Sequence, residues 1–94
     1  MPAYVIIEVE VTDPQAYEDY RNRMPAAIAK HGGTPLARGF TERLEGDSTL
    51  DRMSVIEFPD AETARSWFNS DEVQVLNAMR QKSARSTAKL IIPT

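Results

Sequence analysis

The chain has 94 residues, no cysteine and a formal net charge of −3. This length fits one domain, residues 1–94, with a marginal core, because such a chain buries only about two thirds of its unfolded surface. The lack of cysteine excludes disulfides, thiolate metal ligands and thiol nucleophiles, and the acidic charge argues against general nucleic-acid binding. No apolar run approaches the roughly 20 residues of a membrane span. Because no signal-peptide pattern opens the sequence, we expect a cytoplasmic protein.

The first expected elements are a strand over residues 4–11 and a helix from Pro14 to about Lys30. Alternation along the strand puts Val5, Ile7, Val9 and Val11 on one face and Tyr4, Ile6, Glu8 and Glu10 on the other. Asp13 is the expected N-cap of the helix, and Gly32 suits the left-handed position after its end. Spacings of three and four define an inner helix face of Tyr17, Tyr20, Met24, Ala27, Ile28 and His31.

The second half of the chain predicts two strands, a broken helix and a final strand. The strands cover residues 34–44 and 52–58; in the latter, Ser54, Ile56 and Phe58 face away from Met53, Val55 and Glu57. Asp60 is the expected N-cap of a helix that runs to Phe68, and residues 69–71 indicate a break with a new cap. The next helical segment, residues 72–84, is expected to face inward through Val75, Leu76, Met79 and Lys82. The last strand is expected over residues 86–92.

The order βαββαβ predicts an α+β fold with a four-stranded antiparallel sheet and both helical layers on one face. The helices would cover Val5, Ile7 and Val9. The opposite face, with Tyr4, Ile6, Met53 and Val55, would stay uncovered, and an uncovered apolar face usually marks an interaction site. The simplest cover is the same face of a second copy, so we expect a homodimer.

Five stretches carry a family resemblance: AYVIIEVEVTDPQAYEDY (3–20), KHGGTPLARG (30–39), LEGD (44–47), VIEFPDAETARSWFNSDEVQ (55–74) and RQKSARS (80–86). Through them the chain resembles the domain-of-unknown-function family 1330, a branch of the dimeric α/β-barrel superfamily. The resemblance implies a ferredoxin-like fold, two sheets paired into a barrel, and no established activity. It also implies that the HGG motif at residues 31–33 lies beside the mouth of a cleft.

Two candidates for proton transfer are His31 and Glu57. His31 is the only histidine, and its imidazole titrates near neutral pH, so it could act as a general acid or base. It directly precedes Gly32, however, which favours a helix C-terminal cap over a catalytic role. Glu57, like Glu8, could serve as a base with a raised pKa inside a barrel, or could instead be the ion-pair partner of an arginine.

Arg38, Trp67 and Tyr17 are the candidates for ligand binding. Arg38 stands among apolar neighbours, where a guanidinium binds either a ligand carboxylate or an internal one such as Glu57 or Glu8. Aromatic residues at helical spacing are usually core, but Trp67 is the best candidate for a pocket wall because its indole N–H requires a partner. Arg80, Lys82 and Arg85 form a basic cluster that we interpret as a solvated face without a binding role.

No metal, phosphate or dinucleotide motif occurs, so we expect neither a metal site nor a cofactor. The first functional hypothesis is a protein that binds or transforms a small anionic organic compound without a cofactor. Its pocket would lie between the sheet and the first helix, or at the barrel mouth. The alternative is a non-catalytic structural or regulatory dimerisation module. Haem degradation, known among superfamily members, ranks third because only His31 could be an axial ligand.

Overall fold

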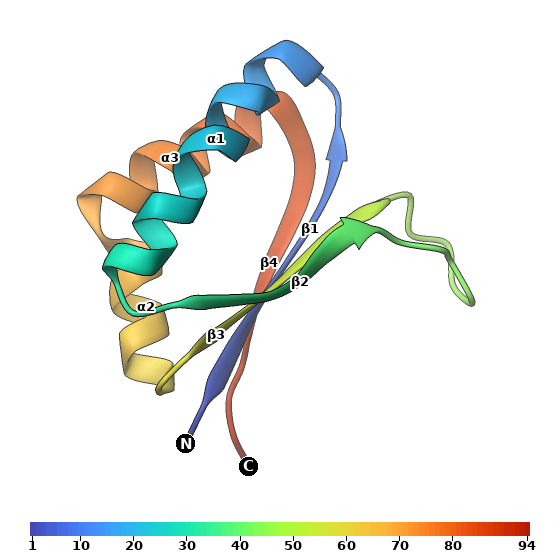
Figure 1. Ribbon diagram of the computed structural model, residues 1–94. Helices are drawn as coiled ribbons and strands as arrows, with labels where there is room; N and C mark the ends of the chain where they lie inside the picture. The colour runs from blue at the N-terminus through green and yellow to red at the C-terminus, as the bar shows by residue number, and fades with distance from the viewer.

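The computed structural model describes residues 1–94 as one antiparallel sheet with a layer of helices on one side (Figure 1). The elements are β1 (Ala3–Val11), α1 (Pro14–Lys30), β2 (Thr34–Phe40), β3 (Arg52–Phe58), α2 (Ala61–Asn69), α3 (Asp71–Ser83) and β4 (Ala84–Ile91). The sheet order is β2-β3-β1-β4, and all three neighbouring pairs are antiparallel. The predicted α+β fold is confirmed.

Local side-chain caps begin the three helices. The Asp13 carboxylate accepts from the Ala16 N–H at 3.2 Å, and the Asp60 carboxylate accepts from the Thr63 N–H at 2.7 Å. Ser70 begins α3 by accepting from the Val73 N–H at 3.3 Å, and its own hydroxyl donates to the Trp67 carbonyl at 2.8 Å. The predicted break at residues 69–71 is therefore confirmed, because Ser70 ends one helix and caps the next.

The core lies between the helices and the helix-side face of the sheet. Val5, Ile7 and Val9 of β1 are buried there, as predicted, together with Ile56 and Phe58 of β3. Trp67 of α2 lies at the centre of this layer, 5.1 Å from the ring of Phe58. From α1 the core takes Tyr20, Met24, Ala27 and Ile28, whose spacing follows one helix face.

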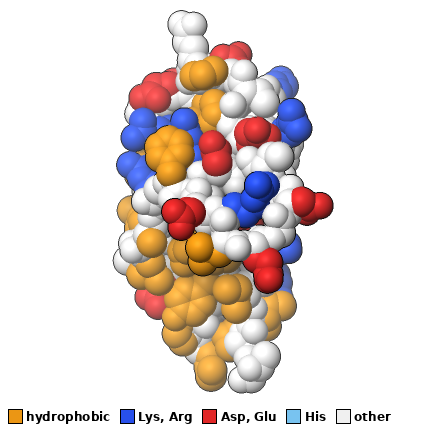
Figure 2. Space-filling view, turned by 90° about the vertical axis from the view of Figure 1, so that its right-hand side faces the viewer, with side chains coloured by type: hydrophobic (Ala, Val, Ile, Leu, Met, Phe, Trp, Pro, Cys, Tyr) orange, Lys and Arg blue, Asp and Glu red, His pale blue; other side chains and the backbone are white.

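The opposite face of the sheet, here called the open face, carries no helix (Figure 1). Tyr4, Ile6, Met53 and Val55 lie on it and are half-buried. Figure 2 looks onto this face and shows apolar side chains gathered over its lower half, while charged side chains occupy the upper half. The predicted uncovered face is therefore present, and charged groups interrupt it.

Three sequence-based boundaries or faces were wrong. Strand β2 ends at Phe40, not at residue 44, because residues 41–51 leave the sheet. Strand β4 begins at Ala84, two residues before the predicted start at residue 86. In α3 the buried residues are Val73, Leu76, Asn77, Arg80 and Ser83. Of the predicted inner face, Leu76 is buried and Met79 is half-buried, whereas Val75 is 56% exposed and Lys82 is exposed, so the prediction was wrong for these last two residues. Polar Asn77 and Arg80 on the true inner face hide its helical pattern.

None of the helices is both long enough and apolar enough to cross a membrane.

Candidate functional site

A cleft of about 450 Å³ opens between α1 and the helix-side face of β2 and β3. It exists because α1 does not extend over β2, all of whose residues are exposed. The floor of the cleft is apolar, with Ile7, Val9 and Ile56, and one wall is formed by Tyr17, Tyr20, Met24, Pro25 and Ile28 of α1. Three arginines line it as well: Arg21, Arg38 and Arg52. We call this site the arginine cleft.

Strand register directs Arg38 and Arg52 into the arginine cleft. Arg38 pairs with Ser54, which pairs in turn with the buried Ile7, and residues directly opposite in an antiparallel pair point to the same face. By the same rule Arg52, paired with Val9 on one side and Phe40 on the other, faces the helices. Both guanidinium groups therefore project on the helix side of the sheet.

A bulge in β2 makes this orientation possible for Arg38. The register shifts between Pro35 and Ala37, so that Pro35 pairs with Ile56 while Ala37 pairs with Val55. This extra residue reverses the phase of the strand beyond it, which is what a bulge does. Without it Arg38 would oppose Met53 and would project from the open face, beside Glu8.

Arg38 and Arg52 have no carboxylate partner within the chain. The ion pairs present are Arg21–Glu18 at 3.5 Å, Lys30–Glu72 at 3.1 Å and Arg85–Glu10 at 3.7 Å. The internal pairing of Arg38 with Glu57 or Glu8, which the sequence left open, is therefore absent. Arg52 instead lies over two aromatic rings, 4.9 Å from the centre of Phe40 and 5.7 Å from that of Tyr17. Such cation–π contacts orient a guanidinium without neutralising it.

Tyr17 supplies a hydroxyl to the wall of the arginine cleft. Burial raises the pKa of Tyr17, and the adjacent Tyr20 adds to the rise, whereas Arg52, Arg80 and Arg21 partly offset it. The phenol is therefore neutral at physiological pH and can donate a hydrogen bond to an anion. The ring is held against that of Tyr20, with 5.3 Å between the ring centres.

Behind this wall lies Arg80, which is only 2% exposed and therefore does not form the solvated face that the sequence suggested. Its Nη1 donates to Asn77 Oδ1 at 2.9 Å, and its Nε donates to Ser86 Oγ at 3.1 Å. It also lies beside the Tyr20 hydroxyl, where it opposes the increase in the pKa of Tyr20 caused by burial. All these neighbours are neutral, so Arg80 adds net positive charge behind the cleft.

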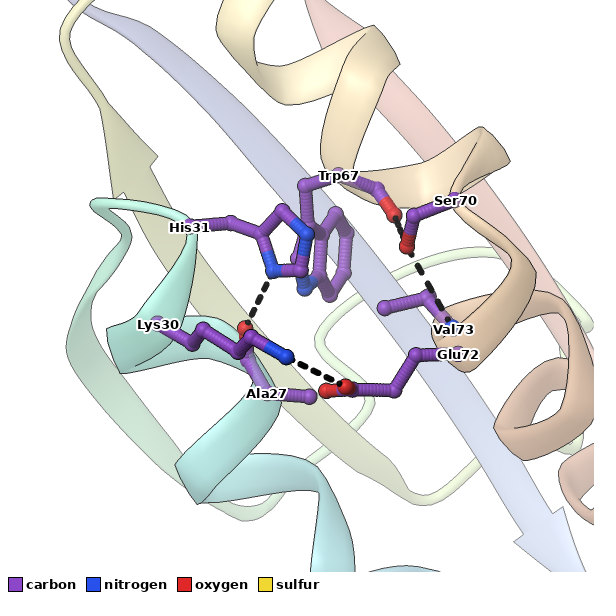
Figure 3. Close-up of polar contacts among 7 residues, drawn as sticks. All are labelled: Ala27, Lys30, His31, Trp67, Ser70, Glu72 and Val73. Atoms are coloured by element: carbon purple, nitrogen blue, oxygen red, sulfur yellow. Dashed lines mark hydrogen bonds and ion pairs between the residues drawn. The ribbon is translucent and has the colours of Figure 1, made fainter.

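His31 and Trp67 lie outside the arginine cleft. The His31 ring turns back onto its own helix, where Nδ1 donates to the Ala27 carbonyl at 2.9 Å (Figure 3). It caps the end of α1, and the Lys30–Glu72 ion pair nearby joins α1 to α3 (Figure 3). Trp67 is 0% exposed and lies in the core, it does not line the arginine cleft, and its buried indole N–H has no partner.

Glu57 lies on the open face, on the other side of the sheet from Arg38. It pairs across the strands with Tyr4. The pKa of the Tyr4 hydroxyl is raised, mainly by desolvation and secondly by the hydrogen bond and negative charge of Glu57. The structure thus brings together Arg38 and Tyr17 but separates them from Glu57, His31 and Trp67. Catalytic roles for His31 and Glu57 stay predictions.

Sequence reasoning missed Arg52 as a residue of the site. The available signal was its phase, because Arg52 shares the alternation of Ser54, Ile56 and Phe58, which predicted the buried side of β3. An arginine in that phase is unusual unless a partner or an open cleft receives it.

The known structures most useful for comparison share the fold at low identity. The RPA0582 protein of unknown function from Rhodopseudomonas palustris has a TM-score of 0.77 at 18% identity, over 99% of this chain and 82% of that one. A dimeric ferredoxin-like protein of unknown function from Jannaschia has a TM-score of 0.74 at 16% identity, over 99% and 100%. SnoaB, a cofactor-independent oxygenase from Streptomyces nogalater, has a TM-score of 0.64 at 14% identity, over 99% and 91%.

These similarities show the ferredoxin-like fold alone. Among curated proteins no sequence matches significantly. The family model described as domain of unknown function (DUF1330) matches residues 2–93, nearly the whole chain. The protein therefore belongs to the DUF1330 family, as the resemblance in its sequence implied.

Proposed function

We propose that this protein binds a small, partly apolar organic anion in the arginine cleft. The observation that carries the proposal is that Arg38 and Arg52 both line the cleft and neither has a carboxylate partner in the chain. Guanidinium groups bind carboxylates through paired hydrogen bonds, and hydrogen bonds to charged groups contribute about 1.5–3 kcal/mol each.

The size and lining of the cleft support a small molecule. Its volume of about 450 Å³ lies within the roughly 300–1,000 Å³ of typical ligand sites. A lining that combines apolar side chains with arginines and a phenol fits a compound with one acidic end and one apolar body. We propose that the acid binds Arg38 and Arg52, that the Tyr17 hydroxyl donates to it, and that the apolar body rests over Ile7 and Ile56.

Calorimetric titration tests the proposal with a panel of small carboxylates, such as benzoate, and their neutral amides, such as benzamide. We expect the carboxylates to bind more tightly, and Arg38→Gln and Arg52→Gln each to weaken that binding roughly 10- to 100-fold, the equivalent of about 1.5–3 kcal/mol. Arg65→Gln is the matched control, because Arg65 is an exposed arginine of α2 outside the arginine cleft and without an ion pair. An equal loss in the control would mean that the anions respond to overall charge and would refute the site.

We also propose that two copies pair through the open face. The half-buried Tyr4, Ile6, Met53 and Val55 are apolar surface that a second copy would cover, and the Jannaschia protein with this fold is described as dimeric. Sedimentation at micromolar concentration should report a dimer, and Val55→Glu should dissociate it, whereas Val75→Glu on exposed α3 should not. A wild-type monomer would disprove the pairing.

These two experiments also test the alternative function. If the dimer forms and no acid in the panel binds, a non-catalytic dimerisation module is the better description. If carboxylates bind the wild type and not the Arg38 and Arg52 variants, the ligand-binding function stands, and chemistry on the ligand becomes the next question.

A further inference from the structure

Residues 41–51 form an extended arm between β2 and β3, called here the arm. It has no regular structure, and it projects from the sheet on the side away from the helices (Figure 1). Its base is fixed: the Thr41 N–H donates to the Asp51 carbonyl at 2.8 Å, and the Asp51 N–H donates to the Val9 carbonyl at 3.1 Å. The arm therefore leaves the molecule in a defined direction, toward whatever covers the open face.

The middle of the arm carries an apolar side chain, Leu44, that packs against almost no part of its own chain. Leu44 is 89% exposed, the highest value among the large apolar residues of the chain. The residues around it are acidic, with Glu42, Glu45 and Asp47 against a single base, Arg43. An apolar residue flanked by carboxylates is complementary, in polarity and charge, to a surface that has an exposed apolar side chain next to a cation.

We infer that the arm of one copy docks on β4 of a second copy, with Leu44 against Ile91 and an arm carboxylate on Lys89. This inference rests on the proposed pairing through the open face. Lys89 and Ile91 both project on that face, since they pair with Ile6 and Tyr4 of β1. Ile91 is 51% exposed, and Lys89 is exposed without an ion pair.

The charges on the open face favour β4 over the other strands as the place where the acidic arm docks. Strands β1 and β3 contribute Glu8 and Glu57 to it, which have no ion pair in the chain and would repel an acidic arm. Strand β4 contributes Arg85 and Lys89, and Arg85 already has an ion pair with Glu10. Lys89 is therefore the cation of this face that is available to a second chain.

The symmetry of a face-to-face dimer is compatible with this contact. The sheet order is β2-β3-β1-β4, so β2 and β4 are its two edges. A two-fold axis along the strands, between the two sheets, reverses this order and lays the β2 edge of one copy over the β4 edge of the other. The arm starts at the β2 edge and so arrives at β4 of the second copy. An axis across the strands would lay β2 over β2 and leave Lys89 without the arm.

Cross-linking tests the contact against a clean background, because the chain has no cysteine. A Leu44→Cys copy is mixed with a Lys89→Cys copy and oxidised mildly, in parallel with a short bismaleimide linker that tolerates a longer separation. We expect a covalent heterodimer that exceeds the products of either variant alone. The matched control mixes Leu44→Cys with Val75→Cys, an exposed position on the helix side, and should give little product.

The outcomes separate this inference from the proposals on which it builds. A dimer by sedimentation without the 44–89 link, or with a preferred link between two copies of Leu44→Cys, overturns the docked arm and leaves the pairing intact. A monomer overturns both. Charge reversal gives an independent check: Lys89→Glu should weaken the dimer at least several-fold, and combining it with Glu45→Lys and Asp47→Lys should restore part of the loss. Failure of the reversal to restore any association would count against the contact.

Discussion

Substitution of Gly33 by alanine should destabilise the protein, because the added methyl group would enter occupied space. Gly33 joins α1 to β2, and its N–H donates to the Ile28 carbonyl at 2.9 Å. A Cβ atom there would lie 2.8 Å from Ile28 Cγ2 and 2.8 Å from both Cε1 and Cζ of Phe58. Real Cβ atoms essentially never approach heavy atoms this closely, so the backbone at residue 33 or the side chains of Ile28 and Phe58 must shift.

Neither neighbour of Gly33 can move freely. Ile28 and Phe58 are both buried, and the Phe58 ring packs against Trp67 at 5.1 Å. Overpacking of this kind typically costs about 1–3 kcal/mol. For a chain of this length each kcal/mol lowers Tm by roughly 4–8 °C, so Gly33→Ala should melt roughly 5–20 °C below the wild type.

Thermal denaturation followed by circular dichroism measures the effect, and Gly39→Ala is the matched control. Gly39 lies in β2 with nothing within 4 Å of its virtual Cβ, so its substitution should be neutral or slightly stabilising. Adding Phe58→Leu to Gly33→Ala should recover about 1 kcal/mol relative to the sum of the single changes, since the smaller side chain removes two of the contacts. Equal melting of the Gly33 and Gly39 variants would refute the steric argument.

Three further variants test the caps and the buried phenol. Ser70→Ala removes the cap shared by α2 and α3 and should cost about 0.5–2 kcal/mol in urea denaturation, whereas Ser66→Ala on the exposed side of α2 should not. Burial raises the pKa of Tyr20, so the stability linked to its neutral form is present below pH 10.0 and is lost as pH rises; Tyr20→Phe should melt less pH-dependently above pH 10.0, and an unchanged alkaline slope would contradict this. The Thr63 N–H lowers the pKa of Asp60 below 3.8, so its contribution is present above pH 3.8 and is lost as pH falls through the folded pKa; Asp60→Asn should flatten that acid limb, as melting scans between pH 2 and 5 would show.

The site was only partly predictable from the sequence, and Arg38 shows why. The sequence indicated Arg38 as a candidate, and a cleft between the sheet and the first helix was one of the two expected pocket locations, but the direction of the side chain could not be predicted. Strict alternation would have placed it opposite Met53, on the side of Glu8, whereas the bulge after Pro35 turns it toward Tyr17. A bulge depends on how two strands pair, and the sequence of one strand does not specify it.

Local interactions allowed the sequence by itself to determine the order of elements, the caps at Asp13 and Asp60, the break at residues 69–71, the left-handed Gly32 and the buried phase of β1. Each of these depends on residues within one turn of helix or a few positions of strand. Only the tertiary structure decided that α3 buries Arg80 in place of Val75, that β2 ends at Phe40, and that Arg38 and Arg52 line the same cleft. Those features depend on where α3 packs against its neighbours and on the register between strands, so they arise only when distant segments come together.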